Sequence, residues 1–158
     1  MNKFFLLCSC LTLLCCCNTT TIYLVRHADK ADNSRDPDLS SAGILRADRL
    51  ASLLGNAHIQ SIFSTDFKRT IQTAKPLSDK MHLPVQFYSP DTLNAFANRL
   101  KYQQVNTLVI GHSNSTISLL DALGLPHTIK VINDSDYSNL FRVIKHRSGK
   151  MKLKELQY

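Results

Sequence analysis

The chain has 158 residues, of which 44% are hydrophobic and 20% charged, a composition that allows one globular domain with a sizeable core. Few glycines and prolines and no internal repeat exclude collagen-like, coiled-coil and low-complexity proteins. The net charge is +7, and all five cysteines lie within the first 17 residues, which excludes a disulfide framework or a cysteine metal site from residue 18 onward.

The first 17 residues, MNKFFLLCSCLTLLCCC, have the pattern of a signal peptide, because one positive charge precedes an apolar run too short to span a bilayer as a helix. The end of this segment also resembles the bacterial lipobox, with Cys17 as the lipidated residue. Cys16 is an alternative, and a signal that is simply cleaved remains open. We therefore expect 1–17 to be a signal peptide of lipoprotein type and 18–158 to be a single domain. The protein is expected to be exported and anchored at the membrane of the cell envelope.

A run of β-branched and aromatic residues, Ile22–Val25, predicts the first buried strand of the domain. A polar loop follows this strand. A helix is predicted over 42–54, because apolar residues recur there at helical spacing and Ser40 or Ser41 can cap its start. The segment 59–64 then predicts a second short strand.

The alternation of strands and helices continues through the second half of the chain. The predicted elements are a helix over 67–81 that is broken or bent near Pro76, a strand over 83–88, a helix capped by Asp91 or Thr92 that runs to about residue 102, a strand over 106–112 and a helix over 113–124. Such alternation predicts an α/β fold, a three-layer sandwich in which a mostly parallel central sheet is flanked by helices on both faces.

The C-terminal tail is basic and is predicted to contain a hairpin. Apolar and basic residues alternate around a turn at Ser148 and Gly149, which favours two strands with one solvated face. The cationic residues of the tail could also face anionic lipid headgroups or an anionic substrate; they are Lys145, Arg147, Lys150, Lys152 and Lys154. No aromatic residues interleave with them before Tyr158, so nucleic-acid binding is not expected.

Two arginines and two histidines follow three of the predicted strands. Arg26 and His27 end the first strand, Arg69 comes shortly after the second, and His112 ends the strand over 106–112. In parallel sheets the carboxyl ends of the strands share one edge, where ligands bind. Cations that repel each other are gathered in this way only around a counter-anion.

A phosphoryl group suits this set of residues better than a metal. The two histidines and Asp29 could ligate zinc, but no third ligand stands at a usual spacing and two guanidiniums would oppose a cation. Arginine matches phosphate oxygens, and a helix that starts near Ser113 adds backbone N–H groups. A histidine below the phosphate could attack phosphorus and form a covalent phosphohistidine, with no metal or other cofactor required.

Four segments resemble, in the same order, the motifs of the histidine phosphatase (phosphoglycerate mutase-like) superfamily: LVRHADK, DLSSAGILRA, IFSTDFKRTIQTA and LVIGHSNS. The resemblance implies that His27 is the nucleophile and that Arg26, Arg69 and His112 complete the phosphate pocket. Asn33 stands where some members place a phosphate-contacting asparagine.

A general acid is the part of the family pattern that this chain lacks in a clear form. Mutase-like members use a glutamate in a segment that is shortened here to YSPDTLNAF, in which Asp91 is the one carboxylate. Asp91 could equally cap a helix, and Asp29 is the other candidate. Small members that act on phosphohistidine need no acid, because imidazole is a better leaving group than an alkoxide.

The expected activity is therefore that of a metal-independent phosphatase acting on a phosphorylated small molecule or envelope component. The short chain resembles the small phosphohistidine phosphatases, whereas export argues against that substrate, because phosphorelay proteins are cytoplasmic. Two alternatives stay open, a protein phosphohistidine phosphatase and a non-catalytic envelope lipoprotein that binds anions. The intact set of arginines and histidines counts against the second alternative.

Overall fold

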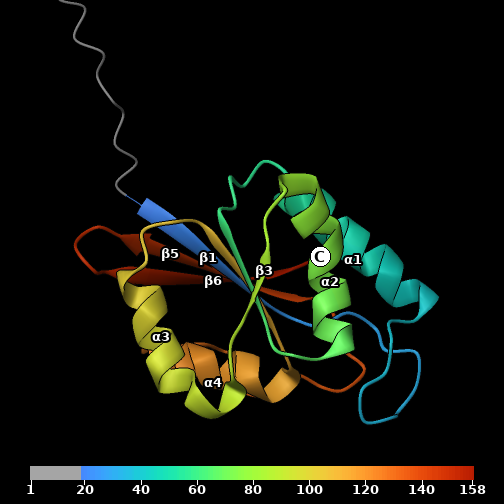
Figure 1. Ribbon diagram of the computed structural model, residues 1–158. Coiled ribbons are helices and arrows are strands. Elements are labelled where there is room, and N and C mark those ends of the chain that lie inside the picture. The colour runs from blue at the N-terminus through green and yellow to red at the C-terminus, as the bar shows by residue number, and fades with distance from the viewer. Residues whose placement is uncertain (1–18) are drawn as a thin grey trace, which may run out of the picture.

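The computed structural model describes residues 19–158, which form one six-stranded sheet with helices packed against it (Figure 1). The strands lie in the order β3-β2-β4-β1-β5-β6. Their bounds are β1 Thr19–Arg26, β2 Ser61–Ser64, β3 Val85–Phe87, β4 Thr107–Gly111, β5 Asn139–His146 and β6 Met151–Gln157. The helices are α1 Ser41–Leu54, α2 Lys68–Met81, α3 Leu93–Tyr102 and α4 Ser113–Leu123, with a short 3₁₀ turn, Pro90–Thr92, before α3.

The sheet is mixed, which corrects the prediction of a mostly parallel sheet. Strands β3, β2, β4 and β1 pair in parallel, whereas β5 runs antiparallel to β1 and β6 antiparallel to β5. The basic hairpin predicted at the C-terminus is confirmed as β5 and β6. Because β6 returns directly after a tight turn, this half of the sheet needs no helical crossover, unlike the parallel half.

Successive residues of β1 pack into different hydrophobic clusters on the two faces of the sheet. Ile22 and Leu24 belong to a cluster with residues of α3 and α4, whereas Tyr23 and Val25 belong to a cluster with residues of α1 and α2. Figure 1 shows these two helix pairs on opposite sides of the strands. A strand covered on both faces has to be apolar at consecutive positions, which explains the unbroken hydrophobic run in the sequence.

The start of α1 follows the predicted capping. The Ser40 side chain accepts a hydrogen bond from the Gly43 N–H (3.1 Å). A Cβ atom at Gly43 would lie 2.1 Å from the carbonyl oxygen of Asp29, so this position of the helix accommodates only glycine. This close approach packs α1 directly against the loop that follows β1.

The predicted break of a helix at Pro76 and the predicted cap of α3 are wrong. Helix α2 runs without a break from Lys68 to Met81, so Pro76 does not end it. The turn before α3 is capped by Ser89, whose hydroxyl accepts from the Asp91 N–H (3.2 Å); neither Asp91 nor Thr92 makes a side-chain cap.

The predictions of a signal peptide, of cleavage and of lipidation at Cys17 or Cys16 fall outside the described residues. Within residues 19–158, none of the helices has the length and apolar character needed to cross a bilayer.

Candidate active site

The ends of three neighbouring strands bring the four predicted residues together. Arg26 is the last residue of β1 and His27 follows it, His112 precedes α4 directly after β4, and Arg69 lies in the first turn of α2 after β2. These four residues line one pocket of about 390 Å³. The other residues that line it are Lys30, Ser34, Arg35, Pro37, Phe67, Pro90, Ser113, Asn114 and Asp134. The edge of the sheet predicted from the sequence is therefore a concave polar site.

His27 is buried and holds its ring in a defined protonation state. Its Nδ1 lies 2.8 Å from the carbonyl oxygen of Ala28, and because a carbonyl can only accept, Nδ1 carries the proton. Burial, and then the charge of Arg26, lower the pKa of His27 to about 3. The ring is neutral at physiological pH, and its Nε2 carries a free electron pair.

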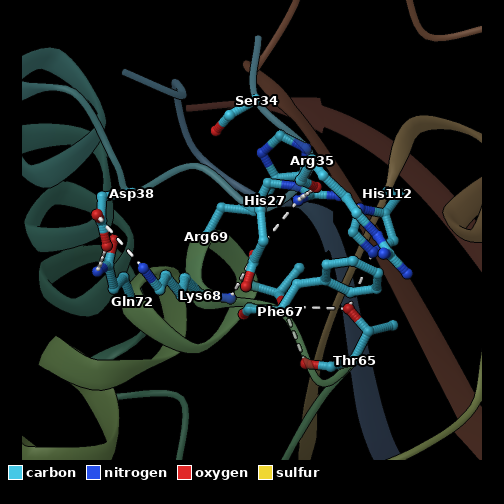
Figure 2. Close-up of polar contacts among 12 residues, drawn as sticks. His27, Ser34, Arg35, Asp38, Thr65, Phe67, Lys68, Arg69, Gln72 and His112 are labelled. Atoms are coloured by element: carbon cyan, nitrogen blue, oxygen red, sulfur yellow. Dashed lines mark hydrogen bonds and ion pairs between the residues drawn. The ribbon is translucent and has the colours of Figure 1, made fainter. Parts of the chain in front are cut away.

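His112 is fixed by partners at both ring nitrogens. The Arg69 guanidinium donates to Nδ1 of His112 (3.2 Å), so Nδ1 must accept. Burial, followed by the charges of Arg69 and Arg26, lowers the pKa of His112 to about 4, so the ring is neutral. Nε2 then carries the proton and donates to the hydroxyl of Thr65 (3.0 Å). Figure 2 shows this chain of contacts from Arg69 through His112 to Thr65.

The hydroxyl of Thr65 donates a hydrogen bond to the hydroxyl of the buried Thr70. Thr65 Oγ1 lies 3.0 Å from Thr70 Oγ1, and the Thr70 hydroxyl reaches the carbonyl oxygens of Thr65 and Phe67, both at 2.9 Å. The hydrogen bonds of this group therefore run in one direction. The Thr65 hydroxyl accepts from His112 and donates to Thr70. The tautomer of His112 depends on a residue that touches no ligand directly.

The ring of Phe67 supports the same group of side chains. The Arg69 guanidinium carbon lies 4.5 Å from its centroid, and the His112 ring packs edge-on against it at 5.0 Å. Such stacking limits the rotamers of both polar side chains without using any of their hydrogen-bond donors. Arg69 and His112 are held in place before a ligand arrives.

Arg26 is clamped by the segment that precedes β5. Its Nη1 donates to the carbonyl oxygens of Asn133 (2.7 Å) and Asp136 (3.1 Å), and its guanidinium carbon lies 4.3 Å from the centroid of Tyr137. Its Nη2 makes a 3.4 Å contact with Asp134, a side chain that is 90% exposed. Nη2 is thus the nitrogen that an oxyanion can recruit by displacing a solvated carboxylate.

A second carboxylate balances Arg69 in a similar way. Asp36 Oδ1 lies 3.6 Å from Nη1 of Arg69, and the same nitrogen donates to the carbonyl oxygen of Arg35 (3.3 Å). Asp36 and Asp134 are therefore counter-ions of the two arginines. Both come from exposed loops, so an incoming phosphate can replace them at low cost.

Side chains of α2 hold the loop between β1 and α1 against the site. Thr73 Oγ1 accepts from the Ala28 N–H (2.9 Å), and Gln72 Oε1 accepts from the Leu39 N–H (2.8 Å). Gln72 also donates to the carboxylate of Asp38 (2.7 Å). The motif that contains Arg69 thus positions both ends of the loop that begins at His27.

Of the other site residues predicted from the sequence, one lines the pocket and three do not. Ser113 lines the pocket at the start of α4, whereas Asn33 is exposed and does not line it. Asp29 forms an ion pair with Arg46 at 2.6 Å, away from the pocket lining. Asp91 is exposed and lines a separate depression between the α3 region and α4. The structure brings neither candidate acid into contact with His27.

Four residues that contact the predicted site residues were not predicted from the sequence: Asp36, Thr65, Asp134 and Tyr137. Thr65 lies in the motif that contains Arg69. A hydroxyl residue directly after a buried strand could have indicated a site residue there. Asp134 and Tyr137 come from a loop more than 100 residues after Arg26, and no local pattern in the sequence connects them.

Among residues 19–158 there is no cluster of three or more His, Cys, Asp or Glu side chains that could hold a metal ion. The pocket is lined by Arg26, Arg35, Arg69 and Lys30, cations that suit an anion.

A family model described as the histidine phosphatase superfamily (branch 1) matches residues 22–89. This range contains Arg26, His27 and Arg69 and ends before His112. The match confirms the resemblance found in the sequence motifs. No curated protein sequence matches the chain.

Solved structures share the fold over most of the chain. The protein histidine phosphatase SixA complexed with tungstate has 19% identity and a TM-score of 0.69, with 87% of this chain and 97% of that chain covered. A mycobacterial glucosyl-3-phosphoglycerate phosphatase has 15% identity and a TM-score of 0.65, with coverage of 88% and 99%. A putative alpha-ribazole-5'-P phosphatase from Escherichia coli has 16% identity and a TM-score of 0.71, with coverage of 88% and 96%.

Proposed function

We propose that this phosphoric monoester hydrolase of the histidine phosphatase type cleaves its substrate through a covalent phosphohistidine on His27, without a metal ion. The observation that carries the proposal is the protonation state of His27. A buried, neutral imidazole presents an unprotonated Nε2 in a pocket lined by three arginines.

In the first step, Nε2 of His27 attacks phosphorus. The N–P bond forms while the bond from phosphorus to the leaving oxygen breaks, and its electron pair departs with that oxygen. The hydrogen bond from Nδ1 to Ala28 stabilises the positive charge that develops on the ring. No proton has to be removed from the nucleophile, because Nε2 is already bare.

The charge of the transferring group is stabilised by Arg26, Arg69 and the N-terminus of α4. Charge spreads over the equatorial oxygens in the transition state, and preorganised donors act there without reorganisation. An anion beside His112 would favour the protonated form of that ring, so His112 would become a further donor. In the second step a water oxygen attacks phosphorus, the N–P bond breaks, and inorganic phosphate and neutral His27 are released.

The pocket favours substrates whose leaving group needs little protonation. Among its described lining residues, one carboxylate is present, Asp134, and it is paired with Arg26 at 3.4 Å. A phosphoester with a weakly basic leaving group suits such a site. We place the substrate in the cell envelope, because the N-terminal segment predicts export and a lipid anchor at Cys17.

Protein phosphohistidine is the second candidate substrate. The same shortage of a free acid supports it, since an imidazole leaving group departs readily. The fold likeness to a protein histidine phosphatase is in keeping with this candidate. Native protein with an unprocessed Met1 would refute the export argument and favour this substrate.

Trapping of the intermediate tests the covalent step. Purified protein is quenched during turnover of a ³²P-labelled aryl phosphate, and the label is expected on His27 as an acid-labile, base-stable adduct. Labelling of wild type and its absence in His27→Ala is the expected pair of results. A wild-type protein that binds phosphate but never becomes labelled would instead support the non-catalytic anion-binding alternative.

Chelation tests the absence of a metal. EDTA should leave turnover unchanged, whereas vanadate or inorganic phosphate should inhibit. Loss of activity in EDTA with recovery on addition of zinc would contradict the proposed mechanism.

A further inference from the structure

The end of the sheet opposite the pocket collects three segments that are distant in the sequence. Thr19, the first residue of β1, pairs with His146 at the end of β5, so the β5–β6 turn lies beside the start of the domain. The Lys145 ammonium donates to the carbonyl oxygens of Leu100 (3.1 Å) and Lys101 (2.9 Å), which ties the end of α3 to the same place. Figure 1 shows the start of β1, the β5–β6 turn and α3 on one side of the molecule.

The two ends of the sheet differ strongly in charge. The connections 55–60, 82–84, 103–106 and 147–150, which lie where the parallel strands start or where β5 ends, contain no acidic residue. The loops at the pocket end contain eight of the twelve acidic residues of the chain, namely Asp29, Asp32, Asp36, Asp38, Asp66, Asp91, Asp134 and Asp136. The pocket end also carries cations, among them Arg26, Lys30 and Arg69, so its charges are mixed. A negative surface would therefore be attracted more strongly by the opposite end.

The side chains at this basic end suit a membrane interface. We call it the basic end face and define it by Lys101, Tyr102, His146, Arg147, Lys150 and Lys152. Tyr102 is 83% exposed at the end of α3, and Lys150 and Lys152 are exposed next to the β5–β6 turn. An exposed tyrosine at the same end of a domain as several cations is typical of a surface that meets lipid headgroups.

The position of the predicted anchor agrees with this surface. Cys17 precedes Thr19 by two residues, so a lipid on Cys17 would enter the domain at the basic end face. The eight residues of β1 separate this face from Arg26 by roughly 23 Å, at about 3.3 Å per residue. A domain seated on this face would hold its pocket away from the membrane.

We infer that the basic end face docks on an anionic lipid surface and orients the pocket toward the aqueous phase. The short tether keeps the face near the headgroups, and the lysines and arginine supply the attraction. The acidic loops around the pocket oppose the inverted orientation. Both effects are electrostatic, so docking weakens as ionic strength rises.

Hydrogen exchange on the full chain tests this orientation. The protein is bound to vesicles of phosphatidylcholine alone or of phosphatidylcholine with phosphatidylglycerol, at equal bound protein. Amides in 101–104 and 146–152 are expected to gain protection in the anionic vesicles only, and to lose it at high salt. Equal protection in both kinds of vesicle, or protection confined to 30–37 and 133–137 around the pocket, would overturn the proposal.

A pair of neutralising variants sharpens the test. Lys150→Gln with Lys152→Gln should lower the docking equilibrium about 25-fold, since each basic residue near an anionic surface contributes about fivefold. Arg49→Gln with Lys75→Gln removes the same charge from exposed positions on α1 and α2 and should leave docking unchanged. Turnover of a soluble aryl phosphate should be the same in both variants. An equal loss of docking in the two variants would mean that net charge, and not this face, drives binding.

Discussion

The floor and the rim of the pocket are built in different ways. The floor consists of Arg26, His27, Arg69 and His112, which lie at or after the ends of buried strands and have defined hydrogen-bond partners. Thr65 does not line the pocket and supports the floor through its contact with His112. The rim consists of loop residues such as Ser34, Arg35 and Asp134, which line the pocket and are exposed to solvent. A group that is fixed before the ligand arrives can stabilise a transition state, whereas a mobile group can adapt to different leaving groups. The chemistry should therefore depend on the floor and substrate choice on the rim.

The largest effect is expected for the nucleophile. His27→Ala should reduce kcat for an aryl phosphate by roughly four orders of magnitude or more, because the proposed covalent intermediate forms on Nε2 of this residue. His146→Ala, at an exposed histidine far from the pocket, is the matched control. Normal turnover by His27→Ala would place the chemistry outside the floor.

The pH dependence of kcat/KM tests the protonation state of His27. Protonation of Nε2 would remove the nucleophilic electron pair, and with the pKa of His27 at about 3 this occurs only in strong acid. Activity should stay flat from pH 8 to pH 5 once the ionisation of the substrate phosphate, near pH 6, is taken into account. An ordinary imidazole with a pKa near 6.5 would instead lower activity about 30-fold at pH 5, and such an acid limb would contradict the derived protonation state.

A smaller effect is expected at Thr65, which acts through His112. Thr65→Val removes the acceptor for His112 Nε2 and should lower kcat by about tenfold with little change in KM, since one oriented donor is lost in the transition state. Thr65→Ser keeps a hydroxyl at this position and should restore most of the rate. If Ser and Val variants are equally impaired, Thr65 serves packing and does not position His112.

The smallest effect is expected at Asp91, which lies outside the pocket. Because Asp91 is exposed and lies outside the pocket lining, Asp91→Asn should change turnover of alkyl and aryl phosphates by less than about twofold. A selective loss of about a hundredfold on alkyl phosphates is the size expected for a general acid and would return Asp91 to that role. Asp29→Asn can be compared in the same assay, although its ion pair with Arg46 makes a stability control necessary.

The predicted elements agree with the observed ones where the signal is local. The strands that contain Ile22 and Leu108 lie where uninterrupted apolar runs predicted them, and Ser40 caps the first helix as expected. The predicted break at Pro76 is absent, because the surrounding helix tolerates the loss of one backbone hydrogen bond. The predicted cap at Asp91 is absent as well, because Ser89 caps a short 3₁₀ turn that contains Asp91 and precedes α3. Local propensity is a weak guide where neighbouring residues offer the same contact.

The sequence by itself determined which end of the sheet carries Arg26, His27, Arg69 and His112, because each stands next to a buried strand and parallel strands end at one edge. Only the tertiary structure decided the direction of β5, the tautomers of His27 and His112, and the pairing of Arg26 with Asp134. Periodicity reports which residues are buried, and it does not report which partner meets them. Contacts between residues about 100 positions apart depend on how the loops close over the assembled sheet, and this is settled only when the whole core packs.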